Sequence, residues 1–354
     1  MVDELIVNKY LIDCGTVASQ QMGRRPSELR VNGTENLVAV ISWRRARLDI
    51  ALITADNKIA FRDQIPLTEE EDKVDKITST FFNIMKPKVG DKRIMGLCII
   101  IPGIIDAENK RILSTVIGVG YSDPVVQRFE EAFHDYPFCL LNDTACFAYA
   151  EYVFANITEP NFAYINVSKG VGACLFANGK MLRGAGSNAT QFGHFSIDRN
   201  GPLCACGNHG CVERVVGENA LTERAEACGI DLTRFAGRKP LYCDIGAMAE
   251  DGDAHAKELI KDLAVDLSFA ISNLITLFNP SLVVIGGMGV NLGPFFLSNI
   301  RDEVQNSGFK EFVSNTWIQY STLGLDSELG GAARYYIDHY YDFFEQMQGG
   351  LYAD

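Results

Sequence analysis

Hydrophobic and polar positions along the chain follow two periods, one typical of strands and one typical of helices. Three apolar runs with polar turns between them, the second turn at Asp56-Asn57, predict a short antiparallel meander at 36–42, 48–54 and 58–65. Further on, apolar residues recur at helical spacing or in short buried runs. They predict helices at about 68–86, 123–134 and 144–156, alternating with strands at 93–101 and 138–142.

The same succession begins again in the second half of the chain. Strands are predicted at 161–168, 171–176 and 179–184, and an irregular Gly- and Cys-rich insertion follows them. Next come a long helix at about 253–278 with Asp253 as its N-cap, a strand at 281–287, a helix at 293–305, a strand at 316–321 and a helix at 327–346. The repeated meander predicts a duplicated, two-lobed α/β protein, because a single doubly wound sheet accommodates a meander poorly.

Composition and charge narrow the class of protein. The 354-residue chain has a net charge of −13, which excludes a broad basic surface for nucleic acid and leaves only local DNA contacts. The basic residues that do cluster are solvated surface or such local contacts: Arg24, Arg25, Arg30, Arg44, Arg45 and Arg47. No apolar run reaches the ~18–20 residues of a membrane span, and the N-terminus is acidic where a signal peptide would be basic. The sequence therefore predicts a cytoplasmic protein without a membrane partner.

Ten cysteines fall into two groups. Seven are scattered singly and are predicted to be buried, reduced thiols. The other three form, with one histidine, the pattern H-x9-C-x-C-x4-C at His194, Cys204, Cys206 and Cys211. Three thiolates and an imidazole make a closed tetrahedral set that is typical of structural zinc. Three reduced cysteines without a metal, iron–sulfur ligation, and His209 in place of His194 are the alternatives.

Several segments resemble the ROK family of sugar kinases and sugar-responsive repressors. They are IPGIID (101–106), NDTACFAYAE (142–151), SKGVGACLFANGKMLRGA (168–185), GHFSID (193–198), CACGNHGCVE (204–213), NLITLFNPSLVVIGG (273–287) and SELGGAARYY (327–336). The resemblance, in particular to the N-acetylglucosamine- and xylose-repressor type of regulator, implies the duplicated actin-like (ribonuclease H-like) sugar kinase fold. It also implies a homodimer or a homotetramer.

The resemblance further implies a sugar-binding site between the lobes, lined by Gly103, Asn142, Asp143, Gln191, His194 and Glu213. Carboxylates and amides suit the paired hydroxyls of a sugar, and Asp143 follows a strand's C-terminal end, where open α/β sheets bind ligands. In the family's kinases this aspartate is the general base, so Asp143 is catalytic only if the chain is a kinase. Gln191 stands where the family has a glutamate, which predicts a changed sugar preference. Outside this context, Asn-Asp would indicate a turn or a helix N-cap.

The first hairpin separates a kinase from a sensor. In the family's kinases it carries an acidic residue, two glycines and a threonine, which let backbone amides approach ATP phosphates. The matching stretch here, VAVISWRRARLDIAL (38–52), has Ser42, Trp43 and Arg44 at the Gly-Gly-Thr positions. We expect the indole ring to replace the backbone approach and no carboxylate to organise magnesium, so ATP and Mg²⁺ are not expected as cofactors. The alternative is that the hairpin's arginines grip phosphate themselves.

Residues 1–35 resemble the last helix and wing of the winged-helix domain in the family's repressors, including the element GRRP at 23–26. DNA is then a partner if the native product carries the rest of that domain; the alternative is a helix that packs on the sensor. The expected domains are 1–35, a first lobe at 36–155 that 327–354 can rejoin, and a second lobe at 156–326 with the zinc loop. The predicted function is a sugar-responsive repressor. A kinase acting on a hexose or N-acetylated amino sugar and a sensor that does not bind DNA are the alternatives.

Overall fold

The computed structural model describes residues 2–16, 27–106, 109–115, 117, 119, 123–185 and 189–341. The chain divides into two compact units, which we call unit 1 (Met1–Ala150 with Asp326–Asp354) and unit 2 (Glu151–Leu325). Unit 2 is thus one continuous segment, and unit 1 is built from the two segments on either side of it. Within the described residues, no helix is long and apolar enough to cross a membrane.

The N-terminal part of unit 1 is a short helix followed by a two-stranded antiparallel sheet, as the sequence predicts: α1 (Val2–Val7), β1 (Leu11–Thr16) and β2 (Ser27–Val31). Buried Tyr10 attaches it to the rest of the unit. The Arg93 guanidinium lies 4.2 Å from the centre of the Tyr10 ring, and the Tyr341 hydroxyl donates to the Tyr10 hydroxyl at 3.0 Å. The GRRP element at 23–26 lies outside the described residues, so the winged-helix assignment stays a prediction.

The main sheet of unit 1 has the strand order β5-β4-β3-β6-β9. Its strands are β3 (Asn36–Trp43), β4 (Arg47–Thr54), β5 (Ile59–Pro66), β6 (Arg93–Ile101) and β9 (Phe138–Asn142). The first three are antiparallel neighbours and form the predicted meander, whereas β6 and β9 run parallel to β3. All five strands lie where the hydrophobic pattern predicts them.

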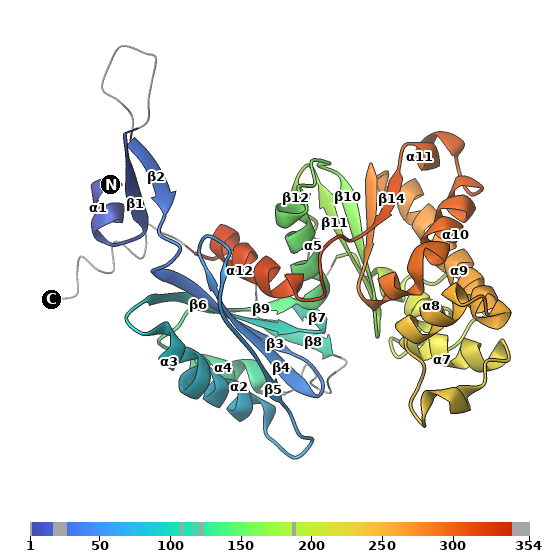
Figure 1. The fold of residues 1–354 in the computed structure, drawn as a ribbon, viewed down its shortest axis with the longest axis horizontal. Coiled ribbons are helices and arrows are strands. Elements are labelled where there is room, and N and C mark those ends of the chain that lie inside the picture. Colours follow the sequence, from blue (N-terminus) through green and yellow to red (C-terminus); the bar gives the residue numbers. More distant parts are fainter. Residues whose placement is uncertain are drawn as a thin grey trace, which may run out of the picture. The chain divides into compact units, whose positions relative to one another are not determined.

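Helices cover the two faces of this sheet (Figure 1). On one face α2 (Lys73–Thr80), the π-helical turn η1 (Phe81–Met85), α3 (Lys86–Val89) and α4 (Val125–Ala132) pack on alternate strand residues such as Ile41, Leu97 and Leu140. On the other face lies α12 (Ser327–His339), whose Tyr336 hydroxyl donates to the Met95 carbonyl at 3.0 Å, while Gly331 packs against the Cys146 carbonyl of α5 (Asp143–Phe154). Strand residues that point to this second face, Ser42 and Asp49 among them, therefore meet α12.

The predicted helix at 68–86 begins later than expected, at Lys73. The Asp72 carboxylate accepts from the amides of Val74 and Asp75 at 2.9 and 3.0 Å, which fixes it as the N-cap. The hydrophobic pattern does not predict the hairpin formed by β7 (Gly103–Asp106) and β8 (Arg111–Thr115). This hairpin follows β6 directly.

Unit 2 repeats the strand topology of unit 1, with the order β12-β11-β10-β13-β14. Its strands are β10 (Phe162–Val167), β11 (Val171–Ala177), β12 (Lys180–Met181), β13 (Leu282–Gly286) and β14 (Trp317–Tyr320). Again the first three are antiparallel, and β13 and β14 run parallel to β10. This repetition confirms the duplicated α/β fold.

The long helix α9 (Ala254–Phe278) dominates the core of unit 2. Asp253 caps it as predicted, accepting from the Ala256 amide at 3.1 Å, and α10 (Gly293–Gln305) packs beside it. The insertion, predicted to be irregular, is partly helical, which corrects that prediction. It contains η2 (Phe192–His194), α6 (Val212–Val216), α7 (Glu218–Ala227), η3 (Leu232–Phe235) and α8 (Tyr242–Glu250); η4 (Met288–Leu292) and α11 (Lys310–Ser314) complete the unit.

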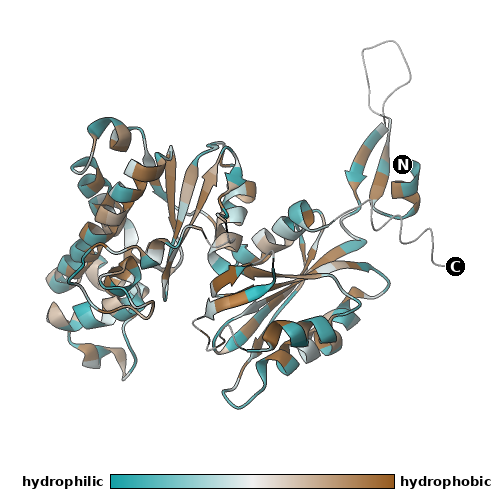
Figure 2. Ribbon diagram, turned by 180° about the vertical axis from the view of Figure 1, so that it is seen from behind, coloured by the Kyte–Doolittle hydropathy of each residue, from teal (hydrophilic) through white to brown (hydrophobic). Residues whose placement is uncertain are grey.

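The insertion folds this way because its helices supply apolar residues to the same core as α9, including Leu221, Ile245 and Met248. Hydrophobic residues line the strands of both sheets, while the helices alternate apolar and polar residues (Figure 2). All ten cysteines are free, but only some of the seven scattered ones are buried as predicted. Cys98, Cys139, Cys146 and Cys174 are buried, whereas Cys228 is half-buried and Cys14 and Cys243 are exposed. The exposed ones lie at the N-terminal sheet and in the first turn of α8.

Candidate functional site

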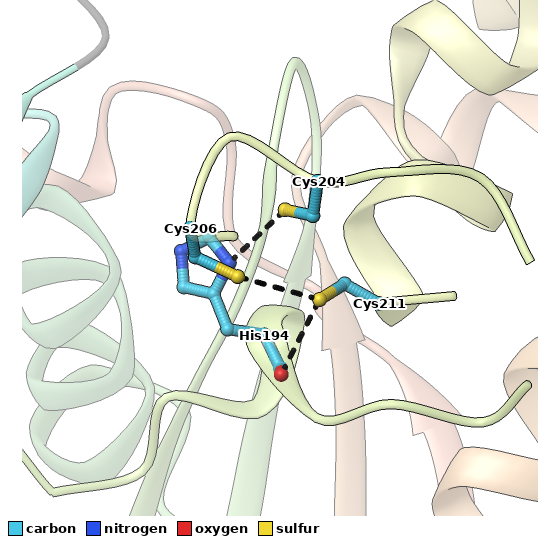
Figure 3. Close-up of side chains that lie close together, drawn as sticks. All are labelled: His194, Cys204, Cys206 and Cys211. Carbon is cyan, nitrogen blue, oxygen red and sulfur yellow. Dashed lines mark hydrogen bonds between the residues drawn. The ribbon is translucent and has the colours of Figure 1, made fainter. Parts of the chain in front are cut away.

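A cluster of three thiols and one imidazole forms in the insertion of unit 2. The ligand atoms of His194, Cys204, Cys206 and Cys211 all lie within 4.8 Å of one another, and Figure 3 shows their side chains converging. The Sγ of Cys204 lies 3.6 Å from Nδ1 of His194, and the Sγ atoms of Cys206 and Cys211 are 3.6 Å apart. A tetrahedral ion with bonds of about 2.3 Å separates its sulfur ligands by roughly 3.7 Å. The four residues could therefore hold one metal ion.

Backbone turns bring these ligands together. The Cys204 amide donates to the Asn208 carbonyl at 2.8 Å and the Gly207 amide to the Cys204 carbonyl at 2.9 Å, which curls the chain around Cys206. Gly210 has φ +60°, and a Cβ there would clash with the Asp198 carbonyl, so glycine is required at this close approach. A backbone bridge between Ser196 and Cys211 holds the loop against the segment that precedes it, and a second bridge between Leu203 and His209 closes the loop itself.

His209, the alternative ligand, lies outside this cluster. Its Nδ1 is 3.0 Å from the Gly201 carbonyl, and its side chain is exposed. The Nδ1 of His194 faces Cys204, which leaves the other ring nitrogen of His194 directed away from the cluster (Figure 3). Three thiolates with one imidazole fill all four positions of a tetrahedron, so the donor set fits a structural ion without an open position for substrate.

The predicted sugar-binding residues of unit 2 lie on the elements that carry the metal cluster. Cys211 is the N-cap residue of α6, and Glu213 lies in the first turn of that helix. Gln191 precedes η2, the single turn that ends at His194. The Glu213 carboxylate accepts from the Val171 amide at 3.2 Å, at the start of β11. Because α6 and η2 are too short to be stable alone, the cluster and β11 determine where Glu213 and His194 point.

The predicted sugar-binding residues of unit 1 lie at the carboxyl end of β9 and beside β6. Asn142 ends β9, and its side-chain amide donates to the Gly103 carbonyl. Gly103 has φ +156°, and a Cβ there would clash with the Ser114 carbonyl of the β7–β8 hairpin. Asp143 is the first residue of α5, and its Oδ1 accepts from the Thr144 amide at 2.8 Å. The structure thus groups Gly103, Asn142 and Asp143 in unit 1, and Gln191, His194 and Glu213 in unit 2.

An arginine from the first hairpin lies among three carboxylates of unit 1. The Nη2 of Arg44 forms an ion pair with Glu328 in the first turn of α12, its Nε lies 3.7 Å from Asp49 on β4, and its Nη1 lies 4.0 Å from Oδ2 of Asp143. We call these four residues the Arg44 cluster. The Asp49 and Glu328 side chains are only 7% and 2% exposed, so water screens these charges poorly.

Burial and charge oppose each other in the Arg44 cluster. Burial raises the pKa of Asp143, and the Arg44 charge partly offsets this rise. Burial also raises the pKa of Glu328 to about 7; Arg44 lowers it and the negative charge of Asp143 raises it. Burial alone would lower the pKa of Arg44, but Glu328 and Asp143 outweigh it, so that its pKa is raised. The single positive charge of Arg44 therefore faces three carboxyl groups and cannot neutralise all of them.

One expectation about the first hairpin is wrong. Trp43 does not cover the hairpin, because its side chain is 1% exposed and packs in the core between the sheet and α2. Asp49 and Glu328 do lie beside the hairpin, but both converge on Arg44, so the expectation that no carboxylate organises magnesium stays a prediction. Arg44 is not simply solvated, because its side chain is 30% exposed and lies among three carboxylates, whereas the Arg47 side chain is 52% exposed and pairs with Asp49 at 2.9 Å. The alternation of strand residues could have placed Asp49 on the α12 face, but nothing local in the sequence connects Glu328 with residue 44.

The chain is similar to known proteins in sequence and in fold. The family model described as "ROK family" matches residues 42–338. The xylose repressor of Bacillus subtilis (strain 168) is 26% identical over 250 residues, which are 70% of this chain but only 62% of the repressor. The DNA-binding transcriptional dual regulator NagC of Escherichia coli (strain K12) is 26% identical over 345 residues, covering 92% of this chain and 83% of NagC.

Solved structures show the same fold. The crystal structure of a ROK family transcriptional regulator, a homolog of the E. coli MLC protein, has a TM-score of 0.78 at 24% identity and covers 94% of this chain and 86% of its own. The ROK hexokinase from Thermus thermophilus has a TM-score of 0.69 at 22% identity, covering 85% of this chain and 98% of the hexokinase. The regulator structure therefore accounts for more of this chain than the kinase structure does.

Proposed function

The chain belongs to the ROK family, and we propose that it acts there as a sugar-responsive transcriptional regulator, a repressor whose effector is a sugar. Its curated relatives include repressors named for xylose and for N-acetylglucosamine. The chain spans about three fifths of the Bacillus xylose repressors, so DNA as a partner and a homodimer or homotetramer as the assembly are part of the proposal.

The observation that carries the sensor interpretation is the position of Arg44. In the kinases of the family, the first hairpin is expected to expose backbone amides to ATP phosphates. Here the Arg44 side chain fills that turn and is bound by Glu328, Asp49 and Asp143 of its own unit. Its charge is already balanced, so it is a poor phosphate ligand, and a second cation beside Asp143 would be repelled by it.

The proposed sugar-binding residues are Gly103, Asn142, Asp143, Gln191, His194 and Glu213. Their amides, carboxylates and imidazole suit a neutral polyol, which is recognised by paired donors and acceptors. Gln191 adds an amide where the family has an acid, which favours hydroxyl or N-acetyl groups over a cationic amine. In this proposal Asp143 accepts hydrogen bonds and does not act as a base.

We further propose that His194, Cys204, Cys206 and Cys211 hold a structural zinc ion. When bound, zinc would supply stability and no reaction step, since all four positions are filled by the protein. The ion would fix the start of α6 and the turn η2, and with them Glu213 and His194.

One experiment separates the sensor from the kinase. D-xylose, N-acetyl-D-glucosamine, D-glucose and D-mannose are titrated by calorimetry without nucleotide, and the same sugars are tested in an ATP-coupled phosphorylation assay. We expect one sugar to bind without turnover, and Asp143→Asn to weaken its binding about tenfold or more, as for lost hydrogen bonds to a charged group. Robust turnover that Asp143→Asn abolishes would show that the protein is a kinase.

A further inference from the structure

Asp143 is held from two sides. Its Oδ1 accepts from the Thr144 amide at the N-terminus of α5, a helix of 12 residues, and its Oδ2 faces Nη1 of Arg44 at 4.0 Å. Helix N-termini and cations both favour the ionised carboxylate, whereas burial favours the neutral acid. The direction in which Asp143 points and the charge that it carries therefore depend on Arg44.

Arg44 is itself fixed by two carboxylates that no ligand can easily reach. Glu328 and Asp49 are almost completely buried and bind separate nitrogen atoms of the guanidinium, Nη2 and Nε. Oε1 of Glu328 accepts from Arg44, whereas its Oε2 has no hydrogen-bond partner in the part of the chain that the structure describes. The planar guanidinium is thus oriented by Glu328 and Asp49, and its third nitrogen is left for Asp143.

This arrangement suits a carboxylate that accepts hydrogen bonds better than one that takes up a proton. A general base must become neutral during its reaction, and a neighbouring cation opposes that step. An acceptor for sugar hydroxyls must instead remain ionised while the sugar is bound. The positive charge of Arg44, which belongs to the chain itself, keeps the Asp143 carboxylate ionised without a nucleotide or a metal ion.

We propose that Arg44 is a positioning residue of the sugar site, whose guanidinium, oriented by Glu328 and Asp49, holds the Asp143 carboxylate ionised and aimed as an acceptor for sugar hydroxyls. The proposal rests on the proposed sugar-binding function. In the kinases of the family, the first hairpin is expected to bind phosphate. In this proposal the first hairpin instead contributes to sugar binding.

The charged and titratable groups around Asp143 come from every element packed against it. They are Arg44 after β3, Asp49 on β4 with its partner Arg47, Cys146 one turn along α5, and Glu328 on α12. Among these groups, Arg44 brings a positive charge to Asp143, whereas Arg47 pairs with Asp49. Without Arg44, Asp143 would face mainly negative or neutral groups, and its ionisation would require a higher pH.

Three variants separate charge from orientation. Arg44→Met removes both, and we expect sugar binding at pH 7 to fall about ten- to hundredfold, with the loss shrinking as pH rises and Asp143 ionises again. Arg44→Lys keeps the charge but cannot reach three carboxylates from three nitrogens, so binding should weaken less and keep the wild-type pH profile. Arg47→Met is the matched control. Arg47 belongs to the same hairpin and, among the described residues, forms its ion pair with Asp49, so the variant loses a charge but should bind the sugar like the wild type.

The measurements are the Kd of the best-binding sugar of the panel between pH 5 and 9, and the titration of Asp143 in the ligand-free proteins. The titration is followed by NMR with ¹³C-labelled aspartate and assigned with Asp143→Asn. A raised Asp143 pKa in Arg44→Met, with a matching shift of the binding profile, would support the proposal. An unchanged Asp143 titration, or a loss of binding that is the same at every pH, would overturn it, because Arg44 would then act through packing alone.

If no sugar of the panel binds the wild-type protein, the proposed function fails. The ligand-free titration still decides the inference in that case, since an Asp143 carboxyl that titrates alike with and without Arg44 contradicts it. Circular dichroism shows whether Arg44→Met is folded. If it is not, Arg44→Lys is compared with the wild type instead. We then expect Asp143 to titrate as in the wild type, and a raised Asp143 pKa in Arg44→Lys would contradict the proposal.

Discussion

The two sheets have the same strand order, yet their first hairpins hold a carboxylate in opposite ways. In unit 1 the turn after β3 presents the long side chain of Arg44 to Asp49, Asp143 and Glu328. In unit 2 the corresponding turn presents Gly170, and the Glu213 carboxylate approaches the bare backbone, accepting from the Val171 amide. A Cβ on Gly170 would clash with that carboxylate. One topology thus provides a charged side chain in one copy and a backbone amide in the other.

A second difference is what supports the two sites. Unit 1 depends on an apolar core and a buried ion cluster, whereas the site residues of unit 2 lie on short turns beside a thiolate cluster. The two units should therefore respond differently to metal removal, to core truncation and to pH.

Metal removal should have the largest effect, and it should be confined to unit 2. Chelation, or Cys211→Ser, is expected to destabilise unit 2 by several kcal/mol, because structural zinc contributes folding free energy directly. Hydrogen exchange measured peptide by peptide would show faster exchange around η2 and α6 and little change in unit 1. Cys174→Ser, which alters a buried thiol of unit 2 outside the cluster, is the control. Equal loss in both units would contradict the comparison.

Core truncation provides the next test, since each unit has one tryptophan. Trp43 is 1% exposed in the core of unit 1, and Trp317 is 60% exposed in unit 2. Trp43→Ala should lower the free energy of unfolding by about 3–5 kcal/mol, and Trp317→Ala by less than about 1 kcal/mol. Urea unfolding of the two variants measures the difference. A small cost at both positions would contradict the placement of the Trp43 ring in the core of unit 1.

A pH test compares two buried glutamates, Glu328 in unit 1 and Glu151 in unit 2, whose pKa values are both raised by burial. A carboxyl with a raised folded pKa binds more protons when folded, so the stability that it contributes is lost as pH rises. For Glu328 this loss should fall between pH 4.5 and about 7, and Glu328→Gln should flatten that part of the stability curve. Glu151→Gln should leave the Arg44 cluster unaffected, as the Asp143 titration can check. An unchanged slope in Glu328→Gln would contradict the assignment.

The smallest effect is expected from Gly170→Ala. The added methyl displaces the end of the flexible Glu213 side chain, which costs less than about 1 kcal/mol of stability. Sugar binding should nevertheless weaken several-fold, because Glu213 would lose its bond to the Val171 amide. Calorimetric titration of the sugar checks this, and Gly252→Ala, outside the metal loop, where a Cβ meets nothing within 4 Å but φ is +96°, controls for backbone strain alone. Unchanged binding would remove Glu213 from the site.

The spacing of apolar residues predicted most strands of both sheets and the long helices, because each of these elements follows a local pattern in the sequence. It failed where tertiary contacts decide the structure. The β7–β8 hairpin depends on Gly103 approaching Ser114, and the helices of the insertion become stable only by packing on α9. Their own sequences are short and weakly periodic, so the pattern alone did not reveal them.

The candidate site shows the same division between local and distant information. The metal cluster was predicted from spacing, because its ligands lie within 18 residues of sequence and the pattern of thiols is distinctive. The Arg44 cluster was not predicted, because its members come from four separate elements and Glu328 is 284 residues from Arg44. The ion pair between Arg44 and a residue this distant in the sequence produces no pattern near residue 44 from which it could be predicted.

The division of unit 1 into two segments has a consequence for the order in which the protein is made. Synthesis proceeds from the N-terminus, and domains generally fold as their residues emerge. Unit 2 is complete once Leu325 has been added, but unit 1 still lacks α12 at that point. During this interval Arg44 has no Glu328 to pair with, and one face of the sheet in unit 1 is uncovered. Of the two units, unit 1 is therefore begun before unit 2 but finished after it, and α12 completes it.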